Sequence, residues 1–523
     1  MDSVPDSTPI IVGVGQHCPQ SVDFTIPSAP ADLAAAAARA ALADSGQAEA
    51  LARKLDTVVF MKLFADIGMF KSPFGGSTKV ARSLTERLGI DPARVVYSAV
   101  GGNVPQKMIN DYAEQITRGE VKAVMLAGGE AMRTAAEARR QEVKLDWNED
   151  PAGDMVDHGP PEDMVGDFEY AHGVGMAIWS YPLFEHAIRG KRGRSVAEHM
   201  QAMGRLCARL NRVAQSNPRA AFRTPRSAEE IATASEKNRI ICHPYTLLMN
   251  ANEKLDAAAA VIMTSAGMAR SLGIDPSRWV YLRGCGDANE RLRTIDHVSF
   301  DSSPAIAMAG RKALEMAGVS IDQIDFFDFY SCFPSSVELA CDALGIAEGD
   351  PREISVTGGL PYFGGPGNNY VLHAVAETAD WLRQGRGRYG MVSGNGGLMS
   401  KESVGIYSTL PGSGEWRRED PKTYQKELDA MPAPRVELQP SGAARIETYT
   451  VHFERGVPAR GVIIGRLLAD DARFVANTPA QSPEMLRWLL EAEPLGARGV
   501  VTNRDGANTF VPTPFGTSMG SAS

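Results

Sequence analysis

The sequence predicts an α/β protein built from two copies of one strand–turn–helix unit, followed by a small β-rich domain. In the clearer copy, residues 355–385, a β-branched run enters the glycine cluster GGLPYFGGPGNN and continues as an amphipathic helix, and a further strand, RYGMVSGNGG, follows at 388–397. Residues 94–132 repeat this order of strand, Gly-Gly-Asn turn, helix and Gly-Gly-ended strand. Two such units about 260 residues apart indicate an internally duplicated fold.

Length and composition are those of an ordinary globular protein. At about 150 residues per domain, 523 residues predict about three structural units. Hydrophobic residues make up 44% of the chain and charged residues 22%, and its net charge is −9. Proteins that follow a nucleic-acid backbone usually present a basic stripe, so this charge disfavours nucleic acid as the main partner.

The cysteines and the N-terminus predict a cytoplasmic protein. The six cysteines are scattered without a CxxC pair, which argues against a disulfide framework or a zinc site and favours a reducing compartment. The first residues, MDSVPDSTPIIVGVGQ, lack a basic segment and an apolar segment of signal-peptide length. No stretch approaches 18 consecutive apolar residues, so we expect no membrane association.

Periodicity divides the chain into five parts. Residues 1–132 form a first βαβ half, with expected strands at 9–16, 56–61, 94–100 and 122–128 and helices at 31–45 and 104–118. Residues 133–250 lose this rhythm and read as an inserted loop or lid domain, with helices near 174–188 and 195–215. The βαβ series resumes over 251–410, with expected strands at 256–264, 279–284 and 324–330 and helices at 304–317 and 334–344.

The C-terminal part has a different pattern. Residues 411–443 are polar and rich in proline and glycine, which predicts a linker. Residues 444–515 alternate apolar and polar positions through a hairpin, a short helix at 483–491 and a further strand pair around an Asp-Gly turn. We expect a small β-barrel of the oligonucleotide/oligosaccharide-binding (OB) type there, and disorder in the last eight or so residues.

Three further motifs link the chain to a known family. GGEAM at 128–132, MNANEKLDAAAAVIM at 249–263 and DFFDFYSCF at 325–333, together with the glycine cassettes, resemble the thiolase superfamily, nearest to its sterol-carrier-protein type. The resemblance covers roughly residues 8–405 in the family's order. It implies a five-layered αβαβα core with two central helices between two five-stranded sheets, CoA thioesters as ligands, and a homodimer, although the added domain leaves a monomer open.

The same resemblance implies that the thiolase catalytic side chains are absent. Gly101 stands where the family has its nucleophilic cysteine, Gly365 where it has the histidine of Gly-His-Pro, and Gly394 where it has the cysteine of Cys-x-Gly. Tyr330 replaces the histidine of His-Asp-Cys-Phe. Cys332 aligns with a motif position that is not nucleophilic, and we expect it to be a small buried residue.

Backbone donors remain as candidates for ligand binding. By the resemblance, the N–H groups of Gly101 and Gly396 face each other as one oxyanion hole, and such donors contribute about 3 kcal/mol toward a developing oxyanion. Four asparagines add polar side chains around the same place: Asn103, Asn368, Asn369 and Asn395. The alternative for each is helix capping or left-handed turn geometry, both of which asparagine favours.

Tyr330 is the one candidate catalytic side chain. Certain thiolase-like aldolases of steroid side-chain degradation use a tyrosine at this position, so a retro-aldol cleavage of 3-hydroxyacyl-CoA by Tyr330 is an alternative function. Those aldolases work with a partner that contains an OB-type barrel, and their second tyrosine lies near the Gly-His-Pro position, which Tyr362 matches inexactly. The competing interpretation is that Tyr330 packs at a strand end with its hydroxyl hydrogen-bonded.

A basic run in the inserted domain predicts the phosphate contacts. Arg189, Lys191, Arg192 and Arg194 lie in the region that corresponds to the family's CoA-contacting loop domain, where charge-assisted bonds to phosphates are expected. A solvated surface loop is the alternative. His172 and His243 lack metal-ligand spacing with any acidic residue or cysteine, so we expect no metal.

The sequence therefore favours a thiolase-like protein that binds CoA or acyl-CoA thioesters in lipid or fatty-acid metabolism without Claisen chemistry and without a further cofactor. The retro-aldolase is one alternative. The other is an interaction or single-strand nucleic-acid-binding role of the C-terminal domain, which requires a basic groove with stacking aromatic residues. That domain contains several arginines and the aromatic residues Tyr449 and Phe474, but acidic residues lie between them: Glu447, Asp470 and Asp471.

Overall fold

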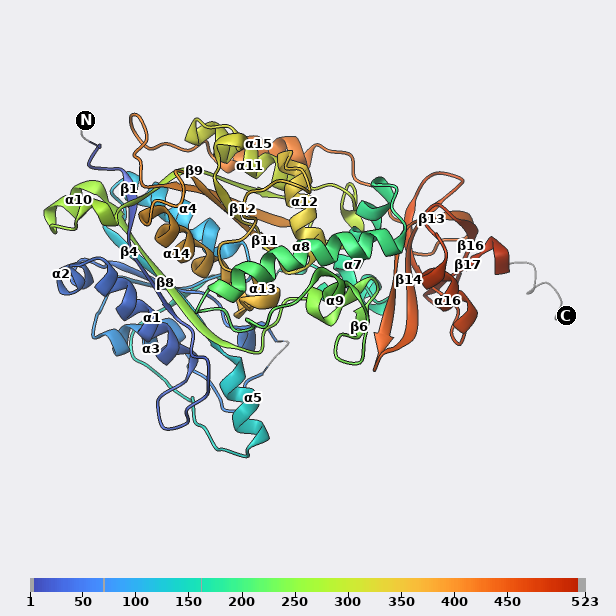
Figure 1. The fold of residues 1–523 in the computed structure, drawn as a ribbon, viewed down its shortest axis with the longest axis horizontal. Coiled ribbons are helices and arrows are strands. Elements are labelled where there is room, and N and C mark those ends of the chain that lie inside the picture. The colour runs from blue at the N-terminus through green and yellow to red at the C-terminus, as the bar shows by residue number, and fades with distance from the viewer. Residues whose placement is uncertain (1–3, 69–70, 161, 516–523) are drawn as a thin grey trace.

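A computed structural model describes residues 4–68, 71–160 and 162–515 (Figure 1). The N-terminal and C-terminal βαβ halves lie side by side, and the C-terminal domain, drawn in red, lies at one end of the long axis. The chain end that we expected to be disordered lies outside the described residues. Within the described ranges, no helix is both long and apolar enough to cross a membrane.

The first half forms one side of the central sheet. Its elements are β1 (Pro9–His17), α1 (Pro30–Asp44), α2 (Ala48–Ala52), β2 (Thr57–Phe60), η1 (Phe64–Ile67), α3 (Val80–Leu88), β3 (Arg94–Tyr97), α4 (Val104–Thr117), β4 (Ala123–Ala131) and, after the insertion, β8 (Asp256–Ser265). The strands lie in the order β3-β2-β4-β8-β1. β3 is shorter than predicted because the chain turns after Tyr97 toward Gly101, whose φ is +149°.

The second half repeats this arrangement. Its elements are α10 (Ala266–Ser271), β9 (Val280–Asn289), α11 (Pro304–Ala317), β10 (Phe326–Asp328), α12 (Pro334–Leu344), α13 (Gly359–Tyr362), η6 (Gly367–Asn369), α14 (Tyr370–Arg383), β11 (Gly390–Gly396) and β12 (Lys401–Ser408). Residues 353–354 accept backbone bonds from Phe327 and Phe329 and so lie at the outer edge of β10. The order 353–356, β10, β11, β12, β9 is that of the first half.

The two halves join at equivalent strands. β1 pairs with β9 antiparallel, Ile10 opposite Tyr281 and Ile11 opposite Val280, so that the strands form one ten-stranded sheet. The helices α4 and α14 each contact strands of both halves and each other, which places them at the centre. The predicted duplication and the pair of central helices are confirmed.

Glycines repeat in the packing of the outer helices. Gly13 and Gly15 of β1 lie so close to the α1 backbone that a Cβ would collide with the carbonyls of Ala41 and Ala37. Gly284 and Gly286 of β9 meet the carbonyls of Ala313 and Ala309 of α11 in the same way. The alanine-rich helices can therefore approach their strands at backbone distance in both halves.

The inserted domain contacts the C-terminal ends of core strands, since Tyr181 accepts from Asn395 of β11 and Asp157 accepts from Lys62, which follows β2. It contains α5 (Met132–Arg140), β5 (Val156–Asp157), α6 (Asp167–Ala171), α7 (Ala177–Lys191), α8 (Val196–Ser216), α9 (Ala228–Ala232), β6 (Ile240–Cys242) and β7 (Tyr245–Thr246). The long α8 begins with a capping box in which Ser195 Oγ accepts from the Glu198 N–H and the Glu198 carboxylate accepts from the Ser195 N–H.

The C-terminal domain is a partly closed ring of strands. It follows α15 (Pro421–Asp429) and comprises β13 (Gly442–Glu454), β14 (Val457–Leu467), β15 (Arg473–Asn477), α16 (Pro483–Glu491), β16 (Arg498–Arg504) and β17 (Ala507–Pro512). The pairing order is β14-β15-β17-β16-β13, and β13 pairs again with β14. This ring agrees with the barrel expected from the sequence.

The barrel and the segment before it are held to the core. β6 and β7 of the inserted domain extend the barrel sheet beyond β13, and Thr448 Oγ1 of β13 donates to the Leu183 carbonyl of α7 at 2.6 Å. The segment predicted as a linker is also packed, because Arg418 pairs with Asp111, Glu114 and Asp287 of the core.

Candidate functional site

A buried carboxylate fixes the glycine cassette. Asp328, at the end of β10, accepts hydrogen bonds from two backbone N–H groups, those of Val356 and Thr357. It also accepts from three hydroxyl groups, those of Ser355, Thr357 and Tyr370. Burial raises the pKa of Asp328, and these bonds oppose that shift. The carboxylate thereby joins the loop before the cassette to the first residue of α14.

The structure brings Gly101 and Gly396 together, as expected for an oxyanion hole. A Cβ built on Gly396 would lie 3.4 Å from the Cα of Gly101. However, the Gly101 N–H already donates to Asn368 Oδ1 at 3.1 Å. Asn103 Oδ1 lies against both glycines, and a side chain at either would collide with it. The Gly101 N–H is therefore used within the protein, and the side chain of Asn103 lies close to both glycines.

Three of the four asparagines, Asn368, Asn369 and Asn395, form side-chain hydrogen bonds between parts of the fold. Asn368 Nδ2 donates to the Lys62 carbonyl at 2.7 Å, and Asn369 Nδ2 donates to the Gly128 carbonyl at 2.8 Å. Asn395 Nδ2 donates to the Tyr181 hydroxyl at 3.0 Å. Asn103 and Asn369 stand at the N-cap positions of α4 and α14, but neither side chain makes a capping bond. Three of the four thus connect the halves or the inserted domain.

The side chain of Tyr330 lies against the glycine turn at Gly101 and Gly102. A Cβ at Gly102 would collide with its hydroxyl, and its ring meets Tyr370 edge-on at 5.6 Å between centroids. Its N–H donates to Ser393 Oγ at 3.1 Å. Burial, with smaller effects of Cys332 and Glu402, raises the pKa of Tyr330, so that the hydroxyl is a neutral phenol. A neutral phenol is a weak general base.

Cys332 is buried beside Tyr330, as expected, and burial raises the pKa of its thiol to about 11. A thiol of that pKa is not a thiolate at neutral pH.

Glu402 is a site residue that sequence reasoning missed. It stands on β12 directly opposite Asn395 of β11, its side chain is buried, and its Oε1 has no hydrogen-bond partner among the described residues. Burial, and then Glu290, raises the pKa of Glu402 well above its ordinary value. The surrounding strand, KESVGIYS, gives no motif that singles this residue out. A buried carboxyl group with a raised pKa therefore lies near Tyr330.

The four basic residues predicted to bind phosphates have different positions. Arg189 is buried and donates to His186, to the Arg194 carbonyl and to Glu493 of the C-terminal domain, so it faces the protein interior. Lys191 is near the surface and donates to the Asp301 carbonyl. Arg192 and Arg194 line a cavity of about 550 Å³ between α8 and α12.

Three further arginines line this arginine cavity: Arg205, Arg209 and Arg212. Their i, i+4, i+7 spacing places them on one face of α8, so helical periodicity is the signal that identifies them in the sequence. Acidic partners accompany four of the five arginines of the cavity: Arg192 pairs with Asp342, Arg194 and Arg205 pair with Glu348, and Arg212 pairs with Glu353. Arg209 donates only to the carbonyls of Glu348 and Arg352 among the described residues.

One buried cluster has metal-ligand chemistry. Glu185, His199 and Glu338, from three helices, have ligand atoms within 4.8 Å of one another. Arg192 Nη1 lies 2.9 Å from Glu338 Oε2, and Tyr245 donates to Glu185. Burial raises the pKa values of both carboxyl groups, which favours a shared proton. The arginine already balances the charge that a cation would balance, so we interpret the cluster as an ion-pair network.

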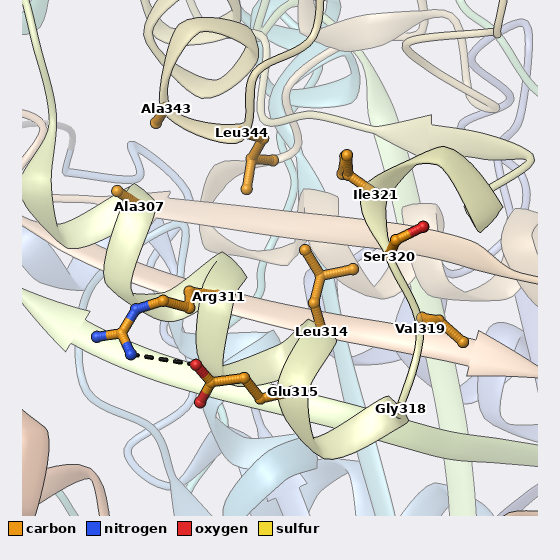
Figure 2. A pocket seen from close by; sticks show the side chains of 10 residues that line it. All are labelled: Ala307, Arg311, Leu314, Glu315, Gly318, Val319, Ser320, Ile321, Ala343 and Leu344. Atoms are coloured by element: carbon orange, nitrogen blue, oxygen red, sulfur yellow. Dashed lines mark hydrogen bonds and ion pairs between the residues drawn. The ribbon is translucent and has the colours of Figure 1, made fainter.

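Another cavity, of about 470 Å³, lies between α11 and α12 (Figure 2). Leu314, Leu344 and Ile321 point into it, and Arg311 is hydrogen-bonded to Glu315 at its margin. Its lining contains no residue of the predicted site.

The two matched halves, with central helices that begin at facing glycine turns, define a thiolase-type fold. A family profile described as "Thiolase-like protein type 1 additional C-terminal domain" matches residues 423–507. The solved structure of a monomeric SCP2-thiolase-like protein type 1 from Mycobacterium smegmatis is 35% identical, with a TM-score of 0.82 over 98% of this chain and 100% of that chain. The chain therefore belongs to the thiolase superfamily, among the SCP2-thiolase-like proteins of type 1.

More distant relatives match part of the chain. The solved Ltp2–ChsH2(DUF35) aldolase is 17% identical, with a TM-score of 0.57 over 78% of this chain and 98% of that chain, which shows the fold alone. Acetyl-CoA acetyltransferase of Schizosaccharomyces pombe is 27% identical over 154 residues. That match spans 29% of this chain and only 36% of the yeast protein.

Proposed function

We propose that this protein binds CoA or acyl-CoA thioesters without catalysing the Claisen reaction of acetyl-CoA acetyltransferases. The observation that supports this most is the arginine cavity. Five arginines line it together with four acidic residues, Glu338, Asp342, Glu348 and Asp350, and Arg209 is bonded only to backbone carbonyls among the described residues, so its positive charge remains for a ligand. Arginine forks suit phosphate oxygens because they form paired, charge-assisted hydrogen bonds.

The position of the cavity fits a ligand whose phosphates lie far from its thioester. α12 begins at Pro334, four residues after Tyr330, and its last turn, with Cys341 and Asp342, lines the cavity. Its 11 residues span about 16 Å at the helical rise per residue. Phosphates held by Arg205 and Arg209 would thus lie one helix length from the former catalytic site.

The filled catalytic site supports binding without turnover. The family nucleophile position is Gly101, and its N–H is engaged by Asn368. Cys332, the nearby cysteine, has a raised pKa because it is buried. On this proposal acyl transfer lacks its cysteine nucleophile, and one of the two expected oxyanion donors, the Gly101 N–H, is already bonded to Asn368.

The test is isothermal titration with CoA, dephospho-CoA, acetyl-CoA and decanoyl-CoA. We expect binding that weakens with salt and with loss of the ribose phosphate. The double variant Arg205→Glu/Arg209→Glu should lose at least tenfold in affinity, whereas Arg53→Glu, at the 70%-exposed arginine that follows α2, should bind as the wild type does. No binding of any of these ligands, or equal binding by the double variant, contradicts the proposal.

A retro-aldolase role for Tyr330 has weaker support. It would need the phenol as a base, whereas burial raises its pKa, and the likeness to the aldolase extends to the fold only. Cleavage of a 3-hydroxyacyl-CoA that Tyr330→Phe abolishes would establish it nevertheless. Assays at pH 7 to 9 would show the rise with pH that a phenolate base requires.

A nucleic-acid-binding role of the C-terminal domain also has weaker support, because its candidate stacking residues are buried. Tyr449 and Phe474 lie in the core of the barrel, and Phe510 packs with them. The basic residues are largely paired, since Arg466 and Arg473 share Glu447 and Arg445 pairs with Asp471. Stacking on these rings therefore requires the barrel to open.

A further inference from the structure

The GGEAM motif at the end of β4 borders a cavity that the proposed CoA site does not use. This β4 cavity measures about 590 Å³, within the range of about 300–1,000 Å³ of small-molecule sites. The start of α1, residues 71–78 and α5 enclose it. None of its lining residues belongs to the arginine cavity.

The walls of the β4 cavity are apolar. Pro30, Leu63, Val80, Met132, Ala135 and Trp147 line them. Such walls favour a ligand with a hydrocarbon chain, because binding then removes apolar surface of both the ligand and the protein from water.

One carboxyl group lies deep in this cavity. Glu130 is 4% exposed, and its Oε1 accepts the Phe64 N–H at 2.8 Å. It also contacts Gly367 of the glycine cassette so closely that a Cβ there would collide with it. Burial raises the pKa of Glu130 to about 8, so it is protonated at neutral pH and has a hydrogen to donate.

The rim of the β4 cavity is positively charged, in contrast to its apolar walls and its buried carboxyl group. Lys71 and Arg139 are exposed at the cavity, and neither forms an ion pair with any other residue that the structure describes. The two other acids of the lining are engaged, since Asp66 accepts from the Tyr97 hydroxyl and Glu149 pairs with Arg87. Unpaired positive charge therefore surrounds the entrance, while the interior offers a neutral donor.

We propose that the β4 cavity is a second ligand site, for a hydrophobic carboxylic acid that has a hydroxyl or keto oxygen at its far end. The carboxylate lies between Lys71 and Arg139, the hydrocarbon body lies against Met132 and Trp147, and the terminal oxygen accepts the hydrogen of Glu130. A cationic amphiphile is disfavoured because its head group would meet the same two cations.

Isothermal titration of the full chain with 10-hydroxydecanoate, decanoate and decylammonium tests the site. We expect the hydroxy acid to bind about three- to tenfold more tightly than decanoate, the effect of one net hydrogen bond, and decylammonium to bind more weakly than both. Glu130→Leu should remove the preference for the hydroxy acid, whereas Glu130→Gln, which keeps a donor and an acceptor, should retain it.

Two variants of α5 provide a matched pair. Ala135→Trp should fill the cavity and abolish binding, and Glu137→Trp, outside the lining, should leave it unchanged; equal thermal midpoints establish that both are folded. No binding of either acid, tighter binding of decylammonium, or undiminished binding by Ala135→Trp overturns the proposal. Since Arg205→Glu/Arg209→Glu should bind 10-hydroxydecanoate normally, failure here is distinguishable from failure of the CoA proposal.

Discussion

The backbone N–H of Gly101 and the Oδ1 of Asn368 form a 3.1 Å hydrogen bond between the two halves of the duplicated fold. Gly101 lies just before α4, and Asn368 lies just before α14. The amide nitrogen of the same asparagine donates to the Lys62 carbonyl. A donor that the family resemblance assigns to ligand binding is thus part of the internal bonding that holds the central helices in place.

Replacing Asn368 by alanine should destabilise the core. The variant leaves the Gly101 N–H and the Lys62 carbonyl without their partners. A buried polar group without a hydrogen-bond partner lowers the free energy of unfolding by about 1–3 kcal/mol. Urea unfolding followed by circular dichroism should show a lower midpoint, while Asn148→Ala, at an exposed asparagine, should not. An unchanged midpoint for Asn368→Ala would mean that water replaces the side chain at no cost.

A cysteine restored at position 101 should not restore thiolase activity. Gly101 has a φ of +149°, and its Cβ would lie 2.6 Å from Asn103 Oδ1, so Gly101→Cys is strained and displaces that side chain. By the family resemblance, Gly365 also stands where the activating histidine is expected. We expect no loss of acetoacetyl-CoA in the presence of CoA and a lowered thermal midpoint. Gly76→Cys, in open space, is the control; measurable thiolysis by Gly101→Cys contradicts the argument.

The duplication was predictable because it depends on local patterns. The glycine turns, the alternation of strands and helices, and one pair of glycines two residues apart in each of β1 and β9 are visible in the sequence, and the glycine pairs have a steric cause. The bond partner of Gly101 was not predictable, because it lies 267 positions away and asparagine is also common at helix caps and turns.

The electrostatic parts of the site divide in the same way. Arg205, Arg209 and Arg212 are separated by helical spacing and were open to prediction, whereas the run at 189–194 drew attention because its four charges lie within six residues. Arg189 of that run is buried against Glu493 because α7 packs on the barrel, a contact that no local pattern indicates. Glu402 stayed hidden because a strand buried on both faces gives no alternation to break.

Acid should destabilise the contact between the barrel and the inserted domain. Here His186 Nε2 lies 3.0 Å from His243 Nδ1, and His452 stacks on Trp179. Burial, with help from Arg189, lowers the pKa of His243 to about 3, and burial, with help from Arg460, lowers that of His452 to about 4. Below pH 6.5 these histidines therefore bind protons in the unfolded chain but not in the folded protein. The free energy of unfolding falls as pH drops from 6.5 toward 4.

The variant His452→Gln isolates one of these protons. Between pH 6 and 4.5 each such histidine adds about 1.4 kcal/mol per pH unit to the loss, so the free energy of unfolding of the variant should fall less steeply by up to that amount. Raised pKa values at Glu130 and Glu338 act in the opposite direction, but they are common to both proteins and cancel in the difference. Parallel pH dependences would show that His452 is protonated in the folded state.

The short strand β5 should keep the protein monomeric. It pairs with β3, Val96 opposite Val156 and Tyr97 opposite Asp157, at the outer edge of the sheet. The buried Lys62 Nζ holds it there by bonds to Asp157 at 2.5 Å and to the Gly159 carbonyl at 2.6 Å. An open edge strand is a template for pairing with a second chain, and covering it removes that route to association.

We therefore expect sedimentation equilibrium to give the mass of one chain, 56.2 kDa, at micromolar concentration. Asp157→Lys should release β5 through like-charge repulsion with Lys62 and produce concentration-dependent association, whereas Asp154→Lys, an exposed change three residues earlier in the same segment, should not. A wild-type dimer would show that another surface drives assembly. A monomeric Asp157→Lys protein would show that the edge remains covered without this ion pair, because β5 then stays in place through its backbone bonds alone.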